Sequence, residues 1–307
     1  MSSALLFPGQ GSQLVGMGRE LSLAFSQANE LFQEADDVLG FHLSRLAWEG
    51  PEEELTLTMN AQPALLVHSI AVHRVLGEEL GTVSMAAGHS LGEFSAHVAA
   101  GTLSFSHALQ AVRARGELMF ASGLERPGTM AAVLGLDDEG VEEVCRRVQE
   151  EGEICVPANF NTQGQVVISG GLAGVERAMT LAIEAGAKKA VPLTVSGAFH
   201  SPLMEPAREG LREQLDKIKF SDPDYPVISN VTAEPVSKGP QARELLVDQL
   251  TSPVRWRASV ERMVEMGAER FFELGPGSVL CGLNRRNARG IRCVSLGTPS
   301  DFDGLGG

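Results

Sequence analysis

The chain has 307 residues, of which 43% are hydrophobic and 21% are charged, as is typical of a soluble globular protein with a large core. Its net charge of −14 argues against nucleic acid or an anionic membrane surface as the main partner. No apolar run is long enough to span a bilayer, and residues 1–8 lack the basic region of a signal peptide. We therefore expect a cytoplasmic protein.

The cysteines are scattered without the CxxC spacing of metal or redox sites; they are Cys145, Cys155, Cys281 and Cys293. A chain of this size needs no disulfide or metal to support its core. We therefore expect free thiols, buried or partly buried, in a reducing compartment.

The first predicted elements surround a glycine-rich turn. A strand is predicted over residues 4–7, followed by the turn Pro8-Gly9-Gln10-Gly11-Ser12-Gln13. Apolar residues at helical spacing then predict a helix over 21–35. Another helix is predicted over 61–80, with Pro63 in its first turn, where proline is tolerated.

The segment Gly88-His89-Ser90-Leu91-Gly92 is the most informative motif. It follows an apolar stretch of small residues and precedes a helical pattern over 94–99, which is the strand–turn–helix context of a nucleophile elbow. A Cβ on either glycine would crowd so sharp a turn. Ser90 is therefore the candidate nucleophile of an acyl-handling enzyme. The next predicted helix, over 106–121, carries Arg115.

Residues 127–196 have a different pattern from the rest of the chain. The predicted order is strand, helix, strand, strand, helix, strand, over 130–136, 140–150, 154–161, 165–169, 173–187 and 189–195. This βαββαβ order is that of a ferredoxin-like unit. We predict an α/β protein in which residues 1–126 and 197–307 form a large α/β-hydrolase-like catalytic domain with a parallel sheet. Residues 127–196 form a ferredoxin-like small subdomain inserted into it.

The C-terminal part returns to the α/β pattern. Strands are predicted over 227–229 and 270–274, and helices over 242–250 and 259–266. Gly275-Pro276-Gly277 predicts a turn before another helix, and the tail from Ser300 is expected to be loose.

A serine nucleophile needs a general base within hydrogen-bond reach, and the chain has seven histidines. Six lie on predicted helices or beside the elbow, where structural roles are expected: His42, His68, His73, His89, His97 and His107. His200 lies in the loop where the insert returns to the large domain, a favoured location for active sites. No histidine follows it, so the late histidine of an α/β-hydrolase triad is missing. We therefore predict a Ser90–His200 dyad, with the histidine oriented by a backbone carbonyl or an amide.

Three more residues complete the predicted acyl site. The planar guanidinium of Arg115 is suited to binding a carboxylate with two hydrogen bonds, which indicates a dicarboxylic half-thioester as substrate. The backbone N–H groups of Gln10 and Leu91 are suited to forming an oxyanion hole.

Seven segments occur together and in order: FPGQGSQ at 7–13, QPAL at 62–65, GHSLGE at 88–93, RG at 115–116, NFN at 159–161, GAFH at 197–200 and ELGPG at 273–277. In this combination the chain resembles the malonyl-CoA:acyl carrier protein transacylases of bacterial type II fatty acid synthesis. The resemblance extends over nearly the whole chain and also implies the two-part fold described above.

The resemblance implies a role for each matching residue. Ser90 attacks the malonyl thioester, His200 carries its proton, and Arg115 holds the free malonyl carboxylate. The oxyanion accepts hydrogen bonds from the N–H groups of Gln10 and Leu91. Three more positions match the family: Gln249 as the residue that orients the histidine, and Gln62 and Asn161 as residues that line the cleft. Phe199, beside the histidine, favours malonyl over α-methyl-branched groups because its ring would meet the branch.

The implied partners are malonyl-CoA and holo acyl carrier protein, with ping-pong kinetics and no metal or redox cofactor. We expect a monomer with no nucleic-acid or membrane partner. Acyl carrier protein is acidic, so docking on this acidic chain requires a local basic patch. Lys188-Lys189 and Arg285-Arg286 are the candidates.

Three other interpretations are considered. The first is a serine hydrolase, such as an esterase or a patatin-like lipase. A patatin-like enzyme would use a Ser–Asp dyad with an Asp-Gly pair, which Asp303-Gly304 could supply, but Arg115 disfavours an apolar acyl group. A carrier-binding module without activity does not need Ser90 and His200. A discrete acyltransferase that serves a polyketide synthase would keep the same fold and chemistry.

Overall fold

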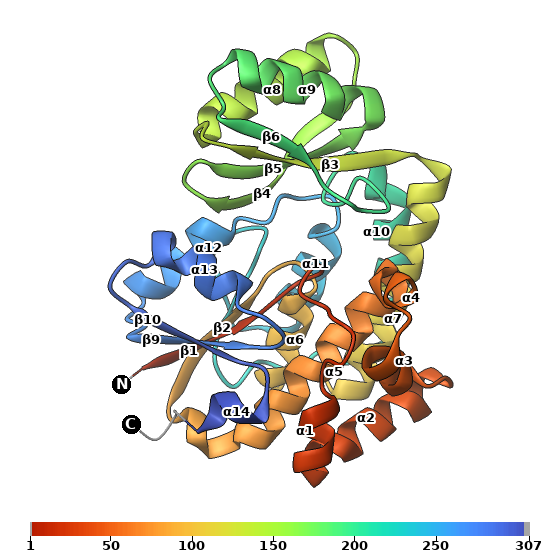
Figure 1. Ribbon diagram of the computed structural model, residues 1–307, viewed down its shortest axis with the longest axis vertical. Coiled ribbons are helices and arrows are strands. Elements are labelled where there is room, and N and C mark those ends of the chain that lie inside the picture. The colour runs from red at the N-terminus through yellow and green to blue at the C-terminus, as the bar shows by residue number, and fades with distance from the viewer. Residues whose placement is uncertain (1, 304–307) are drawn as a thin grey trace.

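The computed structural model describes residues 2–303, which form two sheets that lie one above the other in Figure 1. The larger sheet has the strand order β10-β9-β1-β2-β7-β8. Its strands are β1 (Ser3–Phe7), β2 (Val83–Gly88), β7 (Val227–Ile228), β8 (Pro235–Val236), β9 (Arg270–Leu274) and β10 (Arg292–Leu296). All neighbouring pairs are parallel except β7 and β8. The chain therefore has a mixed α/β fold with a largely parallel sheet.

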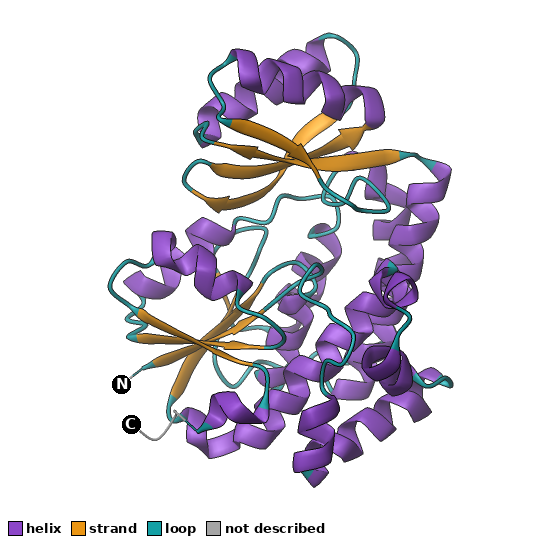
Figure 2. Cartoon of the chain, in the orientation of Figure 1, coloured by secondary structure: helices purple, strands orange, loops and turns teal. Residues whose placement is uncertain are grey.

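Helices cover both faces of the larger sheet (Figure 2). Along β1 the side chains alternate between these faces. Leu5 and Phe7 belong to the core shared with α2, α5, α6 and α7, whereas Ala4 and Leu6 pack with α12 and α13. These helices are α2 (Ser26–Leu39), α5 (Thr58–Leu76), α6 (Gly92–Ala99), α7 (Phe105–Glu125), α12 (Trp256–Glu265) and α13 (Val279–Asn287). Burial on both faces explains why β1 is apolar at nearly every position.

The smaller sheet is antiparallel and has the order β4-β5-β3-β6. It contains β3 (Gly128–Leu134), β4 (Cys155–Thr162), β5 (Gln165–Gly171) and β6 (Lys189–Pro192), with α8 (Asp138–Glu150) and α9 (Leu172–Glu184) on its outer face (Figure 1). The six elements occur in the predicted order, and a separate apolar cluster joins both helices to the sheet. Backbone bonds between Val254 and β4 (Val254 N to Ala158 O, 2.8 Å; Phe160 N to Val254 O, 2.9 Å) connect the smaller sheet to the segment between α11 (Gly239–Asp248) and α12.

The remaining helical segments lie around these layers: α1 (Arg19–Ala24), α3 (Leu43–Glu49), α4 (Glu52–Thr56), α10 (Glu205–Leu215), α11 (Gly239–Asp248), α14 (Pro299–Phe302) and the 3₁₀ turns Gly77–Leu80 and Pro202–Met204. Within residues 2–303, no helix combines the length and apolarity that crossing a bilayer requires.

Two predicted elements differ from the structure. The single helix expected over 21–35 is interrupted at Phe25, whose extended backbone (φ −132°, ψ 121°) separates α1 from α2. The tail is ordered through Phe302, because the Thr298 side chain and Asp301 form a capping box at the start of α14. The rest of the predicted loose tail, residues 304–307, lies outside the described residues.

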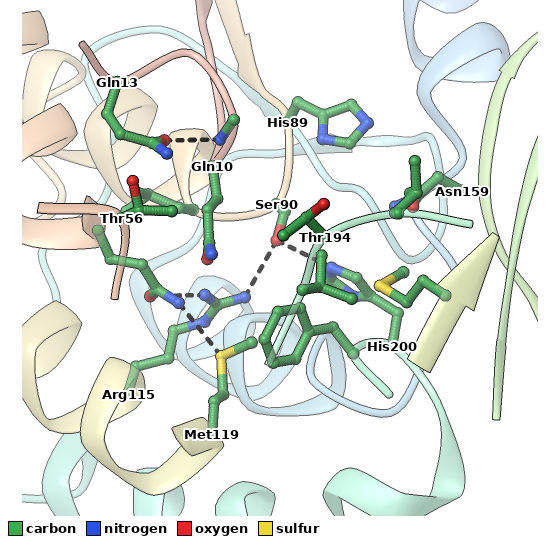
Figure 3. Close-up of a pocket in the computed structure, with 17 residues that line it drawn as sticks. Gln10, Gln13, Thr56, His89, Ser90, Arg115, Met119, Asn159, Thr194 and His200 are labelled. Atoms are coloured by element: carbon green, nitrogen blue, oxygen red, sulfur yellow. Dashed lines mark hydrogen bonds between the residues drawn. The ribbon is translucent and has the colours of Figure 1, made fainter. Parts of the chain in front are cut away.

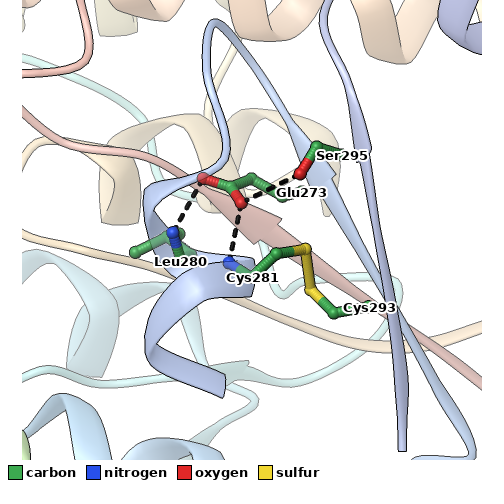
Figure 4. Close-up of a disulfide and its surroundings, with 5 residues drawn as sticks. All are labelled: Glu273, Leu280, Cys281, Cys293 and Ser295. Carbon is green, nitrogen blue, oxygen red and sulfur yellow. Dashed lines mark hydrogen bonds between the residues drawn. A yellow bond between two sulfur atoms is a disulfide. The ribbon is translucent and has the colours of Figure 1, made fainter. Parts of the chain in front are cut away.

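The prediction of four free thiols is wrong for two of them. Cys281 and Cys293 form a disulfide that joins the start of α13 to β10 (Figure 4). Their separation of 12 residues is not a recognisable motif, and only the return of the chain from α13 into β10 brings the sulfur atoms together. Cys145 and Cys155 are free and buried, as predicted.

Candidate active site

The turn that carries Ser90 has the geometry of a nucleophile elbow. It links the end of β2 to the start of α6, and Ser90 has a φ of 52°, which is rare for a residue other than glycine. A Cβ at Gly88 would overlap the backbone of Gly92, and a Cβ at Gly92 would overlap the carbonyl oxygen of Phe7. Both glycines are therefore required for the turn to pass this close to its neighbours.

Replacing Gly92 with alanine is expected to destabilise the fold by about 3 kcal/mol or more, because the overlapping atoms belong to backbone that cannot rotate away. Urea unfolding measures this effect. Gly282→Ala in α13 is the matched control, since a Cβ there meets nothing within 4 Å and alanine favours a helix by about 1 kcal/mol. Equal stability of the two variants would contradict the close approach at the elbow.

Ser90 and His200 form a hydrogen-bonded dyad. Ser90 Oγ lies 2.8 Å from His200 Nε2 (Figure 3). His200 Nδ1 donates to the backbone carbonyl of Gln249 at 2.8 Å. The carbonyl fixes the tautomer in which Nε2 accepts the serine proton. Burial, and then the charge of Arg115, lower the pKa of His200 to about 3. The imidazole is therefore neutral at pH 7, as a general base must be.

Arg115 lies on α7, is fully buried and points at the nucleophile. One terminal nitrogen donates to Gln62 Oε1 at 2.7 Å, and the other donates to Gln249 Oε1 at 2.9 Å and to Ser90 Oγ at 3.2 Å. Burial lowers its pKa to about 10, so the side chain stays charged at neutral pH. Ser90 and Arg115 were predicted from their own chemistry, and Gln62 and Gln249 were implied by the resemblance; the structure brings all four together.

The two predicted oxyanion donors lie beside Ser90. Gln10 and Leu91 both line the pocket, and within residues 2–303 the backbone N–H of neither has an acceptor. The Gln10 side chain bonds Thr58 Oγ1 at 3.1 Å, which holds the glycine-rich turn against α5. Two free N–H groups next to a nucleophile are what a tetrahedral oxyanion requires.

The pocket around the dyad has a volume of about 320 Å³. Phe199, Met119 and Met130 supply apolar walls, and Gln62 lies at the arginine end.

Asn161 does not line this pocket, contrary to the prediction. Its Oδ1 lies 2.9 Å from Nε2 of His89, and the lining position belongs to Asn159. The regular alternation of β4 is interrupted by irregular pairing between Pro157 and Thr162, which periodicity alone does not reveal. The His89 side chain points away from Ser90, as expected (Figure 3).

Two buried residues of the site were not identified from the sequence. Asn230 accepts from the Ser90 N–H at 2.7 Å and donates to the Gly88 carbonyl at 2.7 Å, so it holds the elbow. Glu93 accepts from Gln249 Nε2 at 2.6 Å. The sequence contains a clue to each position. Asn230 follows the end of the short strand β7, where site residues of a parallel sheet gather, and Glu93 is the last residue of the GHSLGE motif.

A serine nucleophile with a neutral histidine base, two free N–H groups and an α/β scaffold defines the class of serine-dependent acyl-transferring enzymes.

A family model described as "Acyl transferase domain" matches residues 4–298. The chain is 49% identical over 300 residues to the malonyl CoA-acyl carrier protein transacylase of Bacillus subtilis, covering 98% of this chain and 95% of the relative. It is 44% identical to the enzyme of that name from Escherichia coli, covering 97% and 96%. The chain belongs to the malonyl CoA-acyl carrier protein transacylase family.

Solved structures agree with this assignment. An acyl-carrier-protein-S-malonyltransferase from Bartonella henselae is 45% identical, with a TM-score of 0.94 and full coverage of both chains (100% each). A malonyl-transacylase solved in complex with a type II PKS acyl-carrier protein is 42% identical, with a TM-score of 0.95 over 99% of each chain.

Proposed function

We propose that this chain transfers the malonyl group from malonyl-CoA to the phosphopantetheine thiol of acyl carrier protein, which supplies extender units for fatty acid synthesis. The observation that carries this proposal is the distance of 3.2 Å between Arg115 and Ser90 Oγ. An acyl group esterified to Ser90 would thus have a buried cation next to it. A malonyl group ends in a carboxylate that matches this cation, whereas an acetyl group does not.

The proposed reaction has two half-reactions through one ester. Ser90 Oγ attacks the thioester carbonyl while its proton moves to His200 Nε2, and the oxyanion accepts from the N–H groups of Gln10 and Leu91. The tetrahedral intermediate then releases the CoA sulfur, which takes the proton from His200. In the second half-reaction the carrier thiol gives its proton to His200 and attacks the malonyl ester, and Ser90 recovers the proton. The thioester is already activated, so the proposal includes no metal or redox cofactor.

Gln249 is proposed to orient the base through its backbone carbonyl rather than through its side chain. The side chain instead bonds Arg115 and the Ser90 carbonyl oxygen. Phe199 is buried at the pocket wall, where its ring supports the proposed preference against an α-methyl branch. Gln62 is proposed to hold the arginine rather than to contact the acyl chain.

The finer description of the fold is also a proposal. The parallel sheet with its elbow after β2 supports an α/β-hydrolase-like domain over residues 1–126 and 197–307. The antiparallel order β4-β5-β3-β6 with two helices on one face supports a ferredoxin-like subdomain over 127–196. We further propose a cytoplasmic monomer that binds neither nucleic acid nor membranes.

Docking of the acidic carrier is proposed at exposed basic residues. Lys188 and Lys189 lie at the start of β6, and Arg285 and Arg286 lie at the end of α13. All four side chains are exposed, and no ion pair to them occurs within residues 2–303, so they are available to a partner.

Intact-mass measurement after exposure to a panel of acyl-CoAs tests the proposed function. Malonyl-CoA is expected to add one malonyl group, located on Ser90 by peptide mapping, and acetyl-CoA is expected to label far less. Addition of holo acyl carrier protein should then remove the group from the enzyme and add the same mass to the carrier. Equal labelling by acetyl-CoA would contradict the carboxylate site, and release of free malonate without carrier would favour a hydrolase.

A polyketide carrier is the second candidate acceptor. A structural neighbour was solved with a type II PKS acyl-carrier protein, so the same experiment should include such a carrier beside that of fatty acid synthesis.

The patatin-like alternative is not supported: Gly304 of its Asp-Gly pair lies outside the described residues, and the Ser90 hydroxyl is bonded to His200 and Arg115.

A further inference from the structure

Glu93 is a fully buried carboxylate in the first turn of α6, and the reaction described above does not use it. Its Oε2 accepts from Gln249 Nε2 at 2.6 Å and from the backbone N–H of Asn230 at 3.2 Å. Its Oε1 has no hydrogen-bond partner among the described residues. A buried carboxylate with one unpartnered oxygen is costly, which calls for an explanation.

The two residues that bond Glu93 also bond the nucleophile, the base and the arginine. Gln249 accepts from Arg115 through its side chain and from His200 through its backbone carbonyl. Asn230 accepts from the backbone N–H of Ser90. Ser90, His200 and Arg115 are therefore each connected to Glu93 by hydrogen bonds through one intervening residue.

Glu93 interacts electrostatically with Arg115, which is the only buried arginine within residues 2–303. The charged group that acts on Glu93 is Arg115 from α7. The other ionisable groups nearby are His200, which bonds the same Gln249, and His89 and His97, which lie four positions before and after Glu93 in the chain. Burial lowers the pKa of all three histidines, so Arg115 is the cation that balances Glu93 within residues 2–303. Burial raises the pKa of Glu93 to about 7, and this shift is opposed by the hydrogen bonds from Gln249 and Asn230 and then by the charge of Arg115.

A malonyl carboxylate on Arg115 would place a second anion beside the same buried cation. Two carboxylates that share such a site do not both remain ionised, and one of them takes up a proton. The malonyl carboxylate would receive charge-assisted bonds from the guanidinium and is therefore the one expected to keep its charge. Protonated Glu93 still accepts the bond from Gln249 through its carbonyl oxygen, so the geometry of the site is preserved.

We propose that Glu93 is a positioning residue for malonyl transfer that takes up a proton when the substrate carboxylate binds Arg115. This inference rests on the proposed function. Ionised Glu93 is linked to Arg115 through Gln249 and balances part of its charge. Protonation of Glu93 leaves that positive charge for the substrate carboxylate.

The pH dependence of KM for malonyl-CoA tests the proposal. With a Glu93 pKa of about 7, binding above that pH requires one proton, so KM should rise about tenfold between pH 6 and pH 8. In Glu93→Gln, which keeps an acceptor oxygen for Gln249 but cannot ionise, KM should be nearly constant over this range. A merely structural role would leave the pH profile of the variant like that of the wild type, and that result would overturn the proposal.

Glu273→Gln is the matched control. Glu273 is a buried carboxylate whose pKa burial also raises, but it accepts from the N–H groups of Leu280 and Cys281 at the start of α13, outside the pocket (Figure 4). This variant should keep the wild-type dependence of KM on pH, whatever its loss of stability.

Calorimetry of Ser90→Ala with malonyl-CoA tests the same idea with Glu93 intact. Titrations at pH 7 in buffers of different ionisation enthalpy should show uptake of about half a proton per malonyl-CoA bound, and none with acetyl-CoA. Binding of malonyl-CoA without proton uptake would overturn the role of Glu93 while leaving malonyl transfer intact. Absence of any malonyl loading in the wild type would instead refute the proposed function.

Discussion

Replacing Ser90 with alanine is expected to abolish the malonyl adduct and to lower transfer to acyl carrier protein by at least about a thousandfold. The Ser90 hydroxyl lies between His200 Nε2 (2.8 Å) and Arg115 (3.2 Å), and within residues 2–303 no other hydroxyl or thiol bonds both of these groups. Intact-mass measurement detects the adduct, and a carrier mass shift measures transfer.

Ser84→Ala is the control for this loss. Ser84 lies on the same strand, β2, and its hydroxyl bonds Ser2 and the Ser3 carbonyl rather than the pocket. That variant should retain transfer close to the wild-type rate. A Ser90→Ala protein that still formed a covalent malonyl adduct would refute the assignment of the nucleophile.

Replacing Arg115 with alanine is expected to lower malonyl loading by about a hundredfold or more, and residual acetyl loading far less. The reason is that only the malonyl group carries an anion that the buried guanidinium can bind. Arg115→Lys should restore little, because one ammonium group cannot donate in parallel to a carboxylate as the planar fork does. Initial rates of loading with both acyl-CoAs measure the ratio.

Arg113→Ala is the matched control for Arg115→Ala. Arg113 lies two positions earlier on α7, but it bonds Glu117, the Met59 carbonyl and Asn60 and does not line the pocket. Urea unfolding of both variants should accompany the kinetics, since removing Arg115 leaves Gln62 Oε1 without its donor. Equal losses of malonyl and acetyl loading would show that Arg115 acts only through the fold.

The elbow could be predicted because its requirements are local. Gly88 and Gly92 are needed by the backbone within a few residues of Ser90, so the sequence itself records them. The strand–helix alternation of residues 127–196 was equally visible, because each element there buries one face and has a clear period. His200 was found by eliminating the other histidines, and the hydrogen bond to Ser90 agrees with that argument.

The contribution of Gln249 could not be predicted in detail, because it depends on which atoms face the site. The resemblance gave the residue, but the structure shows that its backbone serves His200 while its side chain serves Arg115. Asn159 and Asn161 differ for a similar reason, since an irregularity in β4 decides which of them faces the pocket.

The sequence by itself determined the residues whose roles depend on short stretches of chain: the elbow serine, its two glycines, the βαββαβ order and the motifs of the family. Only the tertiary structure decided how distant residues meet. It placed Asn230 and Gln249 around Glu93, and it paired Cys281 with Cys293. The physical reason is that hydrogen bonds and disulfides act over a few ångströms, and separation along the chain does not reveal which polar groups folding brings within that distance.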